Sequence, residues 1–116
     1  MASYLRTHRL KSGMSQSELA ELVGIVSHQQ VSQHERATAT PSLTAALSYQ
    51  FVFRVPMTEL FPGLVESVKL NVEERLYKMK EKLQESTAKG REAQKIARKL
   101  EWLWERDNPS AIDLAS

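Results

Sequence analysis

Polar side chains with directional hydrogen-bonding groups crowd the segment from Ser27 to Arg36. The run His28-Gln29-Gln30 comes first, and Ser32 and Gln33 follow about one helical turn later. A glutamine amide offers a donor and an acceptor together, so it can recognise a partner whose edge carries both groups. In isolation the same run would describe the solvated start of any surface helix. Its meaning therefore depends on the elements around it.

Residues for catalysis or metal binding do not form a recognisable pattern. The sequence contains no glycine-rich phosphate loop and no serine nucleophile elbow, and its first aspartate is Asp107. His8, His28 and His34 include no pair four residues apart, and no acidic residue completes a metal site with them. We therefore predict that the protein is not an enzyme and that it has no catalytic residue, no metal site and no cofactor.

The composition is that of a globular protein, with 41% hydrophobic and 26% charged residues in a chain of 116. The absence of cysteine excludes disulfides and thiolate chemistry and is compatible with a reducing cytoplasm. No apolar run approaches the ~20 residues that span a bilayer, and the charged N-terminus does not resemble an export signal. The net charge is only +2, divided equally between residues 1–62 and 63–116. Neither half therefore carries a polybasic tail that would bind any polyanion by charge alone.

Glycine and serine positions predict three short helices at the start of the chain. A helix that includes residues 4–12 ends at Gly13, and Ser15 with Glu18 forms a capping box for a second helix, which ends at Gly24. A third helix starts at Ser27. Two short helices joined by a glycine-led turn are typical of a helix-turn-helix unit.

Proline positions divide the segment that follows. A fourth helix is expected from Pro41-Ser42, and Val55-Pro56 turns the chain into a short helix over 57–61. Pro62-Gly63 is predicted to end this domain. No strand is expected, because the β-branched residues never alternate with polar ones.

The remainder of the chain carries two apolar stripes with helical spacing. The first predicts a helix from about Val65 to Ala88 and consists of Val65, Val68, Val72, Leu76, Met79 and Leu83. Gly90 interrupts it, and the second stripe consists of Ala93, Ile96, Ala97, Leu100, Leu103 and Trp104. Because such stripes exceed what one small domain can cover, we predict a dimerisation surface. Three arrangements stay open: a hairpin that pairs with its twin, a parallel coiled coil of the first helix, and a hairpin packed on its own N-terminal domain as a monomer.

Two further features of this region have alternative interpretations. Trp102 and Trp104 point ~200° apart on a helix, so we expect one in a core or interface and the other partly exposed. The basic cluster is expected to be a solvated face, with a second contact to the DNA backbone as the alternative; it consists of Lys89, Arg91, Lys95, Arg98 and Lys99.

The stretch from Leu5 to Phe61 resembles the Cro/repressor-type helix-turn-helix domain, also called XRE-like. The resemblance covers about half of the chain, and its motifs follow in the family's order. They are Leu5-Arg6, Arg9-Leu10, Gly13-Met14-Ser15-Gln16, Glu18-Leu19-Ala20, Val23-Gly24-Ile25, Val31-Ser32, Glu35-Arg36, Pro41-Ser42-Leu43 and Glu59-Leu60-Phe61.

The resemblance implies a role for each polar residue around the third helix, which should lie in the DNA major groove. The residues expected to read bases are His28, Gln29, Gln30, Ser32 and Gln33, and a glutamine amide matches N6 and N7 of adenine. Those expected at the DNA backbone are Gln16, Ser27, Arg36, Thr38 and Thr40. Arg9 and Glu35 match an ion pair that ties the first helix to the third, and His34 is expected to pack partly buried.

The sequence departs from the family pattern at three places. One additional residue separates Gly24 from Val31, so the turn or the start of the third helix must be remodelled. Ala37 and Arg54 stand where glycines are common. Both positions are expected to need a left-handed backbone, which costs a non-glycine residue about 1 kcal/mol.

Together these observations predict an all-α protein with a five-helix Cro/repressor-like domain in residues 1–62. A helical extension over 63–108 would dimerise, and 109–116 would form a flexible tail. The dimerisation residues are Val65, Val68, Val72, Leu76, Met79, Leu83, Ile96, Leu100, Leu103 and Trp104. The resemblance implies a transcriptional repressor of the kind frequent in bacteria, a cytoplasmic, nucleoid-associated homodimer on pseudo-palindromic double-stranded DNA. The alternative is an antitoxin-like interaction module, in which the C-terminal helices bind a partner protein.

Overall fold

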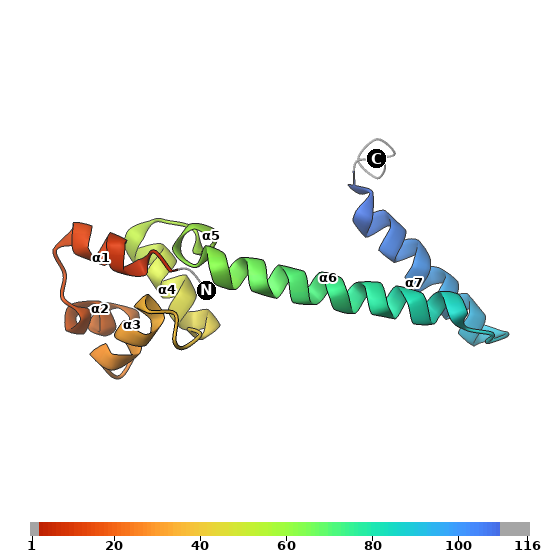
Figure 1. Cartoon of the computed structure of the whole chain (residues 1–116), viewed down its shortest axis with the longest axis horizontal. Coiled ribbons are helices and arrows are strands. Elements are labelled where there is room, and N and C mark those ends of the chain that lie inside the picture. The colour runs from red at the N-terminus through yellow and green to blue at the C-terminus, as the bar shows by residue number, and fades with distance from the viewer. Residues whose placement is uncertain (1–2, 110–116) are drawn as a thin grey trace. The chain divides into compact units, whose positions relative to one another are not determined.

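A computed structural model describes residues 3–109 of the chain (Figure 1). These residues form seven helices and no strand, which confirms the all-α prediction. The helices are α1 (Leu5–Ser12), α2 (Gln16–Val23), α3 (His28–Glu35), α4 (Leu43–Phe53), α5 (Met57–Leu60), α6 (Pro62–Glu85) and α7 (Arg91–Asp107). None of the helices in the described range has the length and apolar character needed to cross a membrane. The tail predicted to be flexible lies outside the described residues from position 110 onward.

The chain divides into two compact units, residues 1–70 and residues 71–116. We call them the N-terminal unit and the C-terminal unit. The division falls within α6. The proposed functional boundary at residue 62 remains a prediction.

The core of the N-terminal unit is built from one to three side chains of each short helix. Its largest fully buried side chains are Leu5, Leu19, Val31, Tyr49 and Leu60. Burial of one such side chain stabilises the fold by about 1.5–3 kcal/mol. Met14, Ile25, Val52, Phe53, Val55 and Leu64 pack around this cluster. The core thus fixes α2 and α3 against the rest of the unit.

The ends of the helices follow the predicted local signals. The Ser15 hydroxyl accepts from the Glu18 backbone N–H, and the Glu18 carboxylate accepts from the Ser15 N–H, each over 3.0 Å. Hydrogen bonds from the Ser15 backbone N–H and from the Ser15 hydroxyl to the Glu18 carboxylate lower the pKa of Glu18, because both favour its charged form. Gly13 and Gly24 end α1 and α2 in the left-handed conformation, with φ of 78° and 72°. The capping box and both glycine stops are confirmed.

Two residues other than glycine also adopt the left-handed conformation. Ala37 has φ of 57° and Arg54 has φ of 55°, as their places in the family pattern predicted. Each follows a helix and lets the chain reverse, since the Arg54 N–H reaches the Gln50 carbonyl and the Thr38 N–H reaches that of Gln33. The folded state carries a small strain at both positions.

The helix predicted from about Val65 begins earlier, at Pro62, and the domain boundary expected at Pro62-Gly63 stays a prediction. Pro62 is the first residue of α6, where its missing N–H costs nothing because the first N–H groups of a helix have no intrahelical partner. The helix then ends at Glu85 rather than near Ala88. Gly90, with φ of 68°, caps the start of α7 instead of only interrupting a helix.

In the C-terminal unit the chain reverses after α6, and α7 runs back at a steep angle to it (Figure 1). Arg106 bonds both carboxylate oxygens of Glu73, at 2.5 and 3.4 Å. Leu103 is buried, whereas Leu76, Leu83, Ile96 and Leu100 are half-buried. The predicted stripes are therefore partly covered within one chain. Trp102 and Trp104 are both exposed in the single chain, so the place expected for one of them in an interface stays a prediction.

Candidate nucleic-acid interface

The outer face of α3 gathers the polar residues singled out by the sequence. His28, Gln29 and Gln33 are exposed, and Ser32 is half-exposed. A shallow hollow of about 360 Å³ is lined by Gln16, His28, Gln29, Ser32, Gln33 and Arg36. Its walls offer amide, hydroxyl, imidazole and guanidinium groups. The surface is therefore suited to hydrogen bonding with a polar, negatively charged partner.

The inner face of α3 holds the helix against the core. Val31 is fully buried, and His34 and Glu35 are each 7% exposed. His34 Nδ1 and the Tyr49 hydroxyl share a hydrogen bond of 2.8 Å, with their rings edge to face. His34 was predicted to pack partly buried, and it is buried to a greater extent than that. Burial lowers the pKa of His34 and raises that of Tyr49, because it disfavours the charged form of each ring.

An ion pair joins α1 to the end of α3. Arg9 Nε lies 2.5 Å from Glu35 Oε2, and Arg9 Nη2 lies 3.2 Å from Oε1. The two side chains are only 10% and 2% exposed, so water screens this pair little. The Arg9 Nη1 also donates to the Met14 carbonyl at 3.0 Å. The pair thus fixes both the orientation of α3 and the loop that precedes α2.

Gln16 extends this network toward the surface. Its Nε2 donates to Glu35 Oε1 over 3.0 Å, so one carboxylate orients both Arg9 and Gln16. An amide nitrogen has two N–H groups, and the second remains available to a partner at the rim of the hollow. Gln16 is thereby held where α2 and α3 meet.

The loop after α3 places its polar residues in different ways. Arg36 is exposed, and its Nε donates weakly to the Ser32 carbonyl at 3.4 Å. The Thr38 hydroxyl caps α3 through the Gln33 carbonyl at 3.4 Å. Thr40 is exposed further along the loop. Only Arg36 of these three lines the hollow.

Two other predicted residues lie outside the hollow. Gln30 is exposed but does not line it, since it lies about 200° around the helix from His28. Ser27 precedes α3 in an extended conformation and makes no side-chain cap. It lines a separate hollow on the α2 side, together with Ile25, Val26 and His28.

Sequence reasoning missed one residue of this surface and one residue of the core beneath it. Val26 is 97% exposed in the turn before α3, where the additional residue of the spacing is accommodated. The sequence signal that could have predicted this exposure was an apolar residue within an otherwise polar turn. Tyr49, the partner of His34, carried no local signal, because the two residues are 15 positions apart.

The comparisons with known proteins concern the N-terminal unit. Residues 5–60 match a family model described as helix-turn-helix. No curated protein matches the chain.

Proposed function

Because residues 5–60 belong to the Cro/C1-type helix-turn-helix family of DNA-binding domains, we propose that this protein is a sequence-specific transcriptional repressor. It would act in the cytoplasm on the nucleoid, as a homodimer on a pseudo-palindromic operator. No catalytic step is part of this proposal. The observation that carries it is the hollow on α3, whose lining residues all belong to the set expected to touch DNA.

The positions of these residues support a division of roles. Gln29 and Gln33 lie four apart on the exposed face of α3, so both amides can meet base edges in the major groove. His28 and Ser32 flank them and would complete the readout. Gln30 is assigned a peripheral contact, because it lies off this face.

The backbone contacts would come from the rim. Gln16 offers an N–H oriented by Glu35, and Arg36 offers a charge beside it. Thr40 and Ser27 are assigned weaker contacts, and Thr38 could join them only through its backbone or a changed rotamer. Such contacts position the protein on DNA without specifying a sequence.

Two DNA-binding domains are needed, because one domain makes few contacts with DNA. The N-terminal unit has little net charge, so a single half-site would be bound weakly. A dimer doubles the contacts and matches a two-fold operator with half-sites about 34 Å apart. A dimer that covers such an operator also blocks other proteins from the same DNA, which is repression by occupancy.

A second candidate function is an interaction module for a different protein. The observation that favours it is the exposed apolar set on α6 and α7, which includes Val72, Met79, Trp102 and Trp104. An antitoxin-like chain would cover these residues with its partner and bind DNA secondarily.

Selection of genomic fragments by the purified full-length protein tests the first proposal. One enriched palindrome, lost in a Gln29→Ala/Gln33→Ala variant and kept in a Gln94→Ala control, would support the repressor. Absence of any enriched sequence, together with a stable co-purifying protein, would instead support the interaction module.

A further inference from the structure

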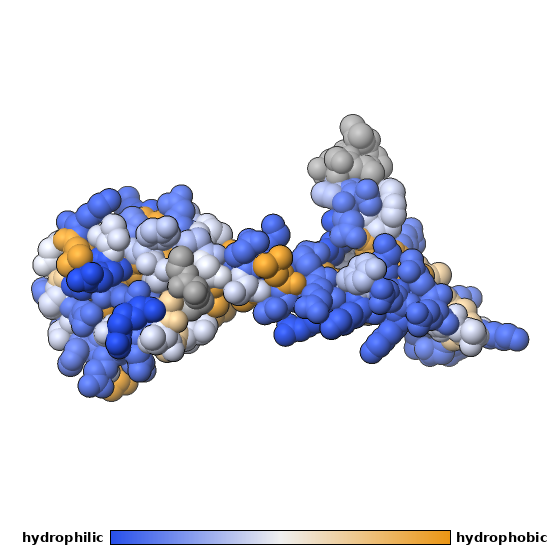
Figure 2. Space-filling view, in the orientation of Figure 1, coloured by the Kyte–Doolittle hydropathy of each residue, from blue (hydrophilic) through white to orange (hydrophobic). Residues whose placement is uncertain are grey.

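The C-terminal unit has an uneven distribution of charge along its length. Its turn end, residues 78–99, carries eight Lys or Arg against three Glu, a net charge of +5. Its open end, residues 71–77 and 100–107, carries two Arg against five acidic residues, a net charge of −3. Hydrophilic side chains dominate the visible face of these helices (Figure 2).

The hairpin does not neutralise this difference internally. The pair Glu73–Arg106 and the buried Leu103 hold the open ends of the two helices together. The negative part of α6 therefore lies beside the negative part of α7, and the positive parts share the turn end. The unit is left with a basic end and an acidic end roughly 22 Å apart, the length of the fifteen α6 residues from 71 to 85 at about 1.5 Å each.

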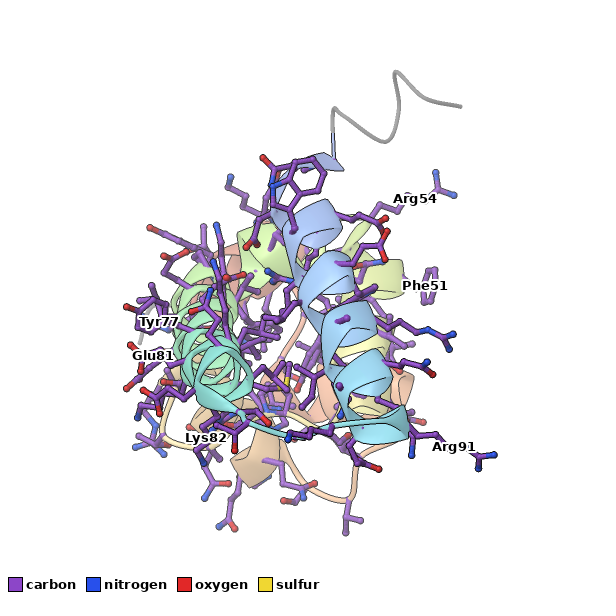
Figure 3. All side chains as sticks on the ribbon, turned by 90° about the vertical axis from the view of Figure 1, so that its right-hand side faces the viewer. Phe51, Arg54, Tyr77, Glu81, Lys82 and Arg91 are labelled. Carbon is purple, nitrogen blue, oxygen red and sulfur yellow. The ribbon has the colours of Figure 1, made fainter. Side chains whose placement is uncertain are left out.

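One flank of the hairpin is polar. Glu73, Leu76, Tyr77, Lys80 and Arg106 line a hollow of about 190 Å³ there. Figure 3 shows Tyr77 and Glu81 on the same side of α6, turned away from α7. A hydrogen bond to Glu81 raises the pKa of Tyr77. On this flank the ion pair between Glu73 and Arg106 joins the two helices.

The opposite flank is apolar and open. Val72 and Met79 precede Glu73 and Lys80 by one residue each, so they point about 100° away from the polar flank. Trp104 precedes Arg106 by two residues and points about 160° away from it. Their exposed fractions are 40%, 38% and 58%. Leu76 and Leu83 lie between the two flanks.

We propose that this open flank binds the same flank of a second copy, with the two hairpins antiparallel. The inference rests on the proposed homodimer and specifies its geometry. In this orientation the turn end of each copy, with a net charge of +5, lies along the open end of the other copy, with a net charge of −3. The dimer therefore contains this attraction between unlike charges two times. A parallel pair would place +5 on +5, and like-charge juxtaposition suppresses such a register. The charge pattern is thus complementary to itself, which selects a second copy over an unrelated partner.

Salt dependence of self-association gives the first test. Sedimentation of the full chain should show dimers that weaken roughly tenfold or more between about 0.05 M and about 0.5 M NaCl, because salt screens the attraction between unlike ends. A parallel dimer would strengthen instead, because salt screens its repulsion. Lys95→Glu/Arg98→Glu should weaken the dimer, whereas Lys11→Glu in the N-terminal unit should not. If the double variant leaves the dimer intact and lowers only DNA binding, the basic end serves DNA and the proposal is wrong.

Cysteine cross-linking gives the second test, and the cysteine-free chain provides a clean background. Thr87→Cys marks the turn end and Asn71→Cys marks the open end. A mixture of the two variants should form a disulfide dimer, and neither variant alone should. Cross-linking of Thr87→Cys to itself, or a dimer without the mixed disulfide, would overturn the antiparallel arrangement. If the genomic selection still yielded an enriched palindrome, the proposed repressor function would remain supported. Failure of the antiparallel arrangement can therefore be distinguished from failure of the proposed function.

Discussion

The Gln16 amide donates to Glu35 Oε1, the same oxygen that accepts from Arg9 Nη2. A residue expected at the DNA phosphate is therefore oriented by a buried ion pair before DNA arrives. Such preorganisation reduces the entropy lost when the contact forms. It also links the stability of the α1–α3 junction to the geometry of the proposed interface.

Removal of Gln16 should weaken binding without changing its salt dependence. Gln16→Ala should lower affinity for operator and for random DNA by the same factor, because a neutral phosphate contact releases no counterion. Arg36→Ala should instead reduce the slope of log K against log salt by about one unit. Salt titrations of both variants and of Lys11→Ala as a control decide this. An unchanged slope for Arg36→Ala would remove Arg36 from the phosphate contacts.

Loss of either exposed glutamine of α3 should relax specificity at one base position. Gln29→Ala and Gln33→Ala should each cost about 1–3 kcal/mol on the selected operator, because each removes a bidentate contact. Affinity for random DNA should stay the same. Gln94→Ala, on exposed α7, is the matched control. Parental affinity in both α3 variants would exclude these residues from base readout.

Local and non-local features of this fold differ in how far the sequence predicts them. The Ser15–Glu18 box and the stop at Gly24 depend on residues a few positions apart, so their pattern is visible in the chain. A proline is an ambiguous local signal, because it can follow the end of one helix or begin the next. In the structure Pro62 begins α6. Arg9 and Glu35 were paired only through the family resemblance, because 26 positions separate them.

Coverage of an apolar stripe cannot be derived from its spacing. Leu76 and Leu83 share a stripe with Val72 and Met79, yet α7 covers the first two more than the second two. A heptad pattern indicates that a helix face packs against another helix. It does not show whether that helix belongs to the same chain or to a second copy. The charges of the C-terminal unit became informative only once α7 was placed beside α6.

The buried pair of Arg9 and Glu35 should show strong coupling in a double-mutant cycle. Arg9→Met and Glu35→Gln should each lower the free energy of unfolding by up to about 3–5 kcal/mol, because each strands a buried charge. The double variant should lose less than the sum. The exposed pair Glu74–Lys78, at 63% and 66% exposure, is the control and should show almost no coupling. Additive effects for the buried pair would mean that its energies are independent despite the contact.

The N-terminal unit should lose stability as the pH falls below neutrality, in part through His34. Its pKa is lowered in the folded state by burial, so the unfolded chain binds the proton more readily. The stabilisation is complete above the ordinary histidine pKa of 6.5 and is lost as the pH falls from there through the folded-state pKa. His34→Gln should flatten this loss between pH 8 and pH 5, and His28→Gln, on the exposed face of α3, should not. Because both tryptophans lie in the C-terminal unit, urea titrations should be followed by NMR signals of Leu19 and Val31. An equal pH dependence in the parent and in His34→Gln would show that carboxylates alone cause the acid sensitivity.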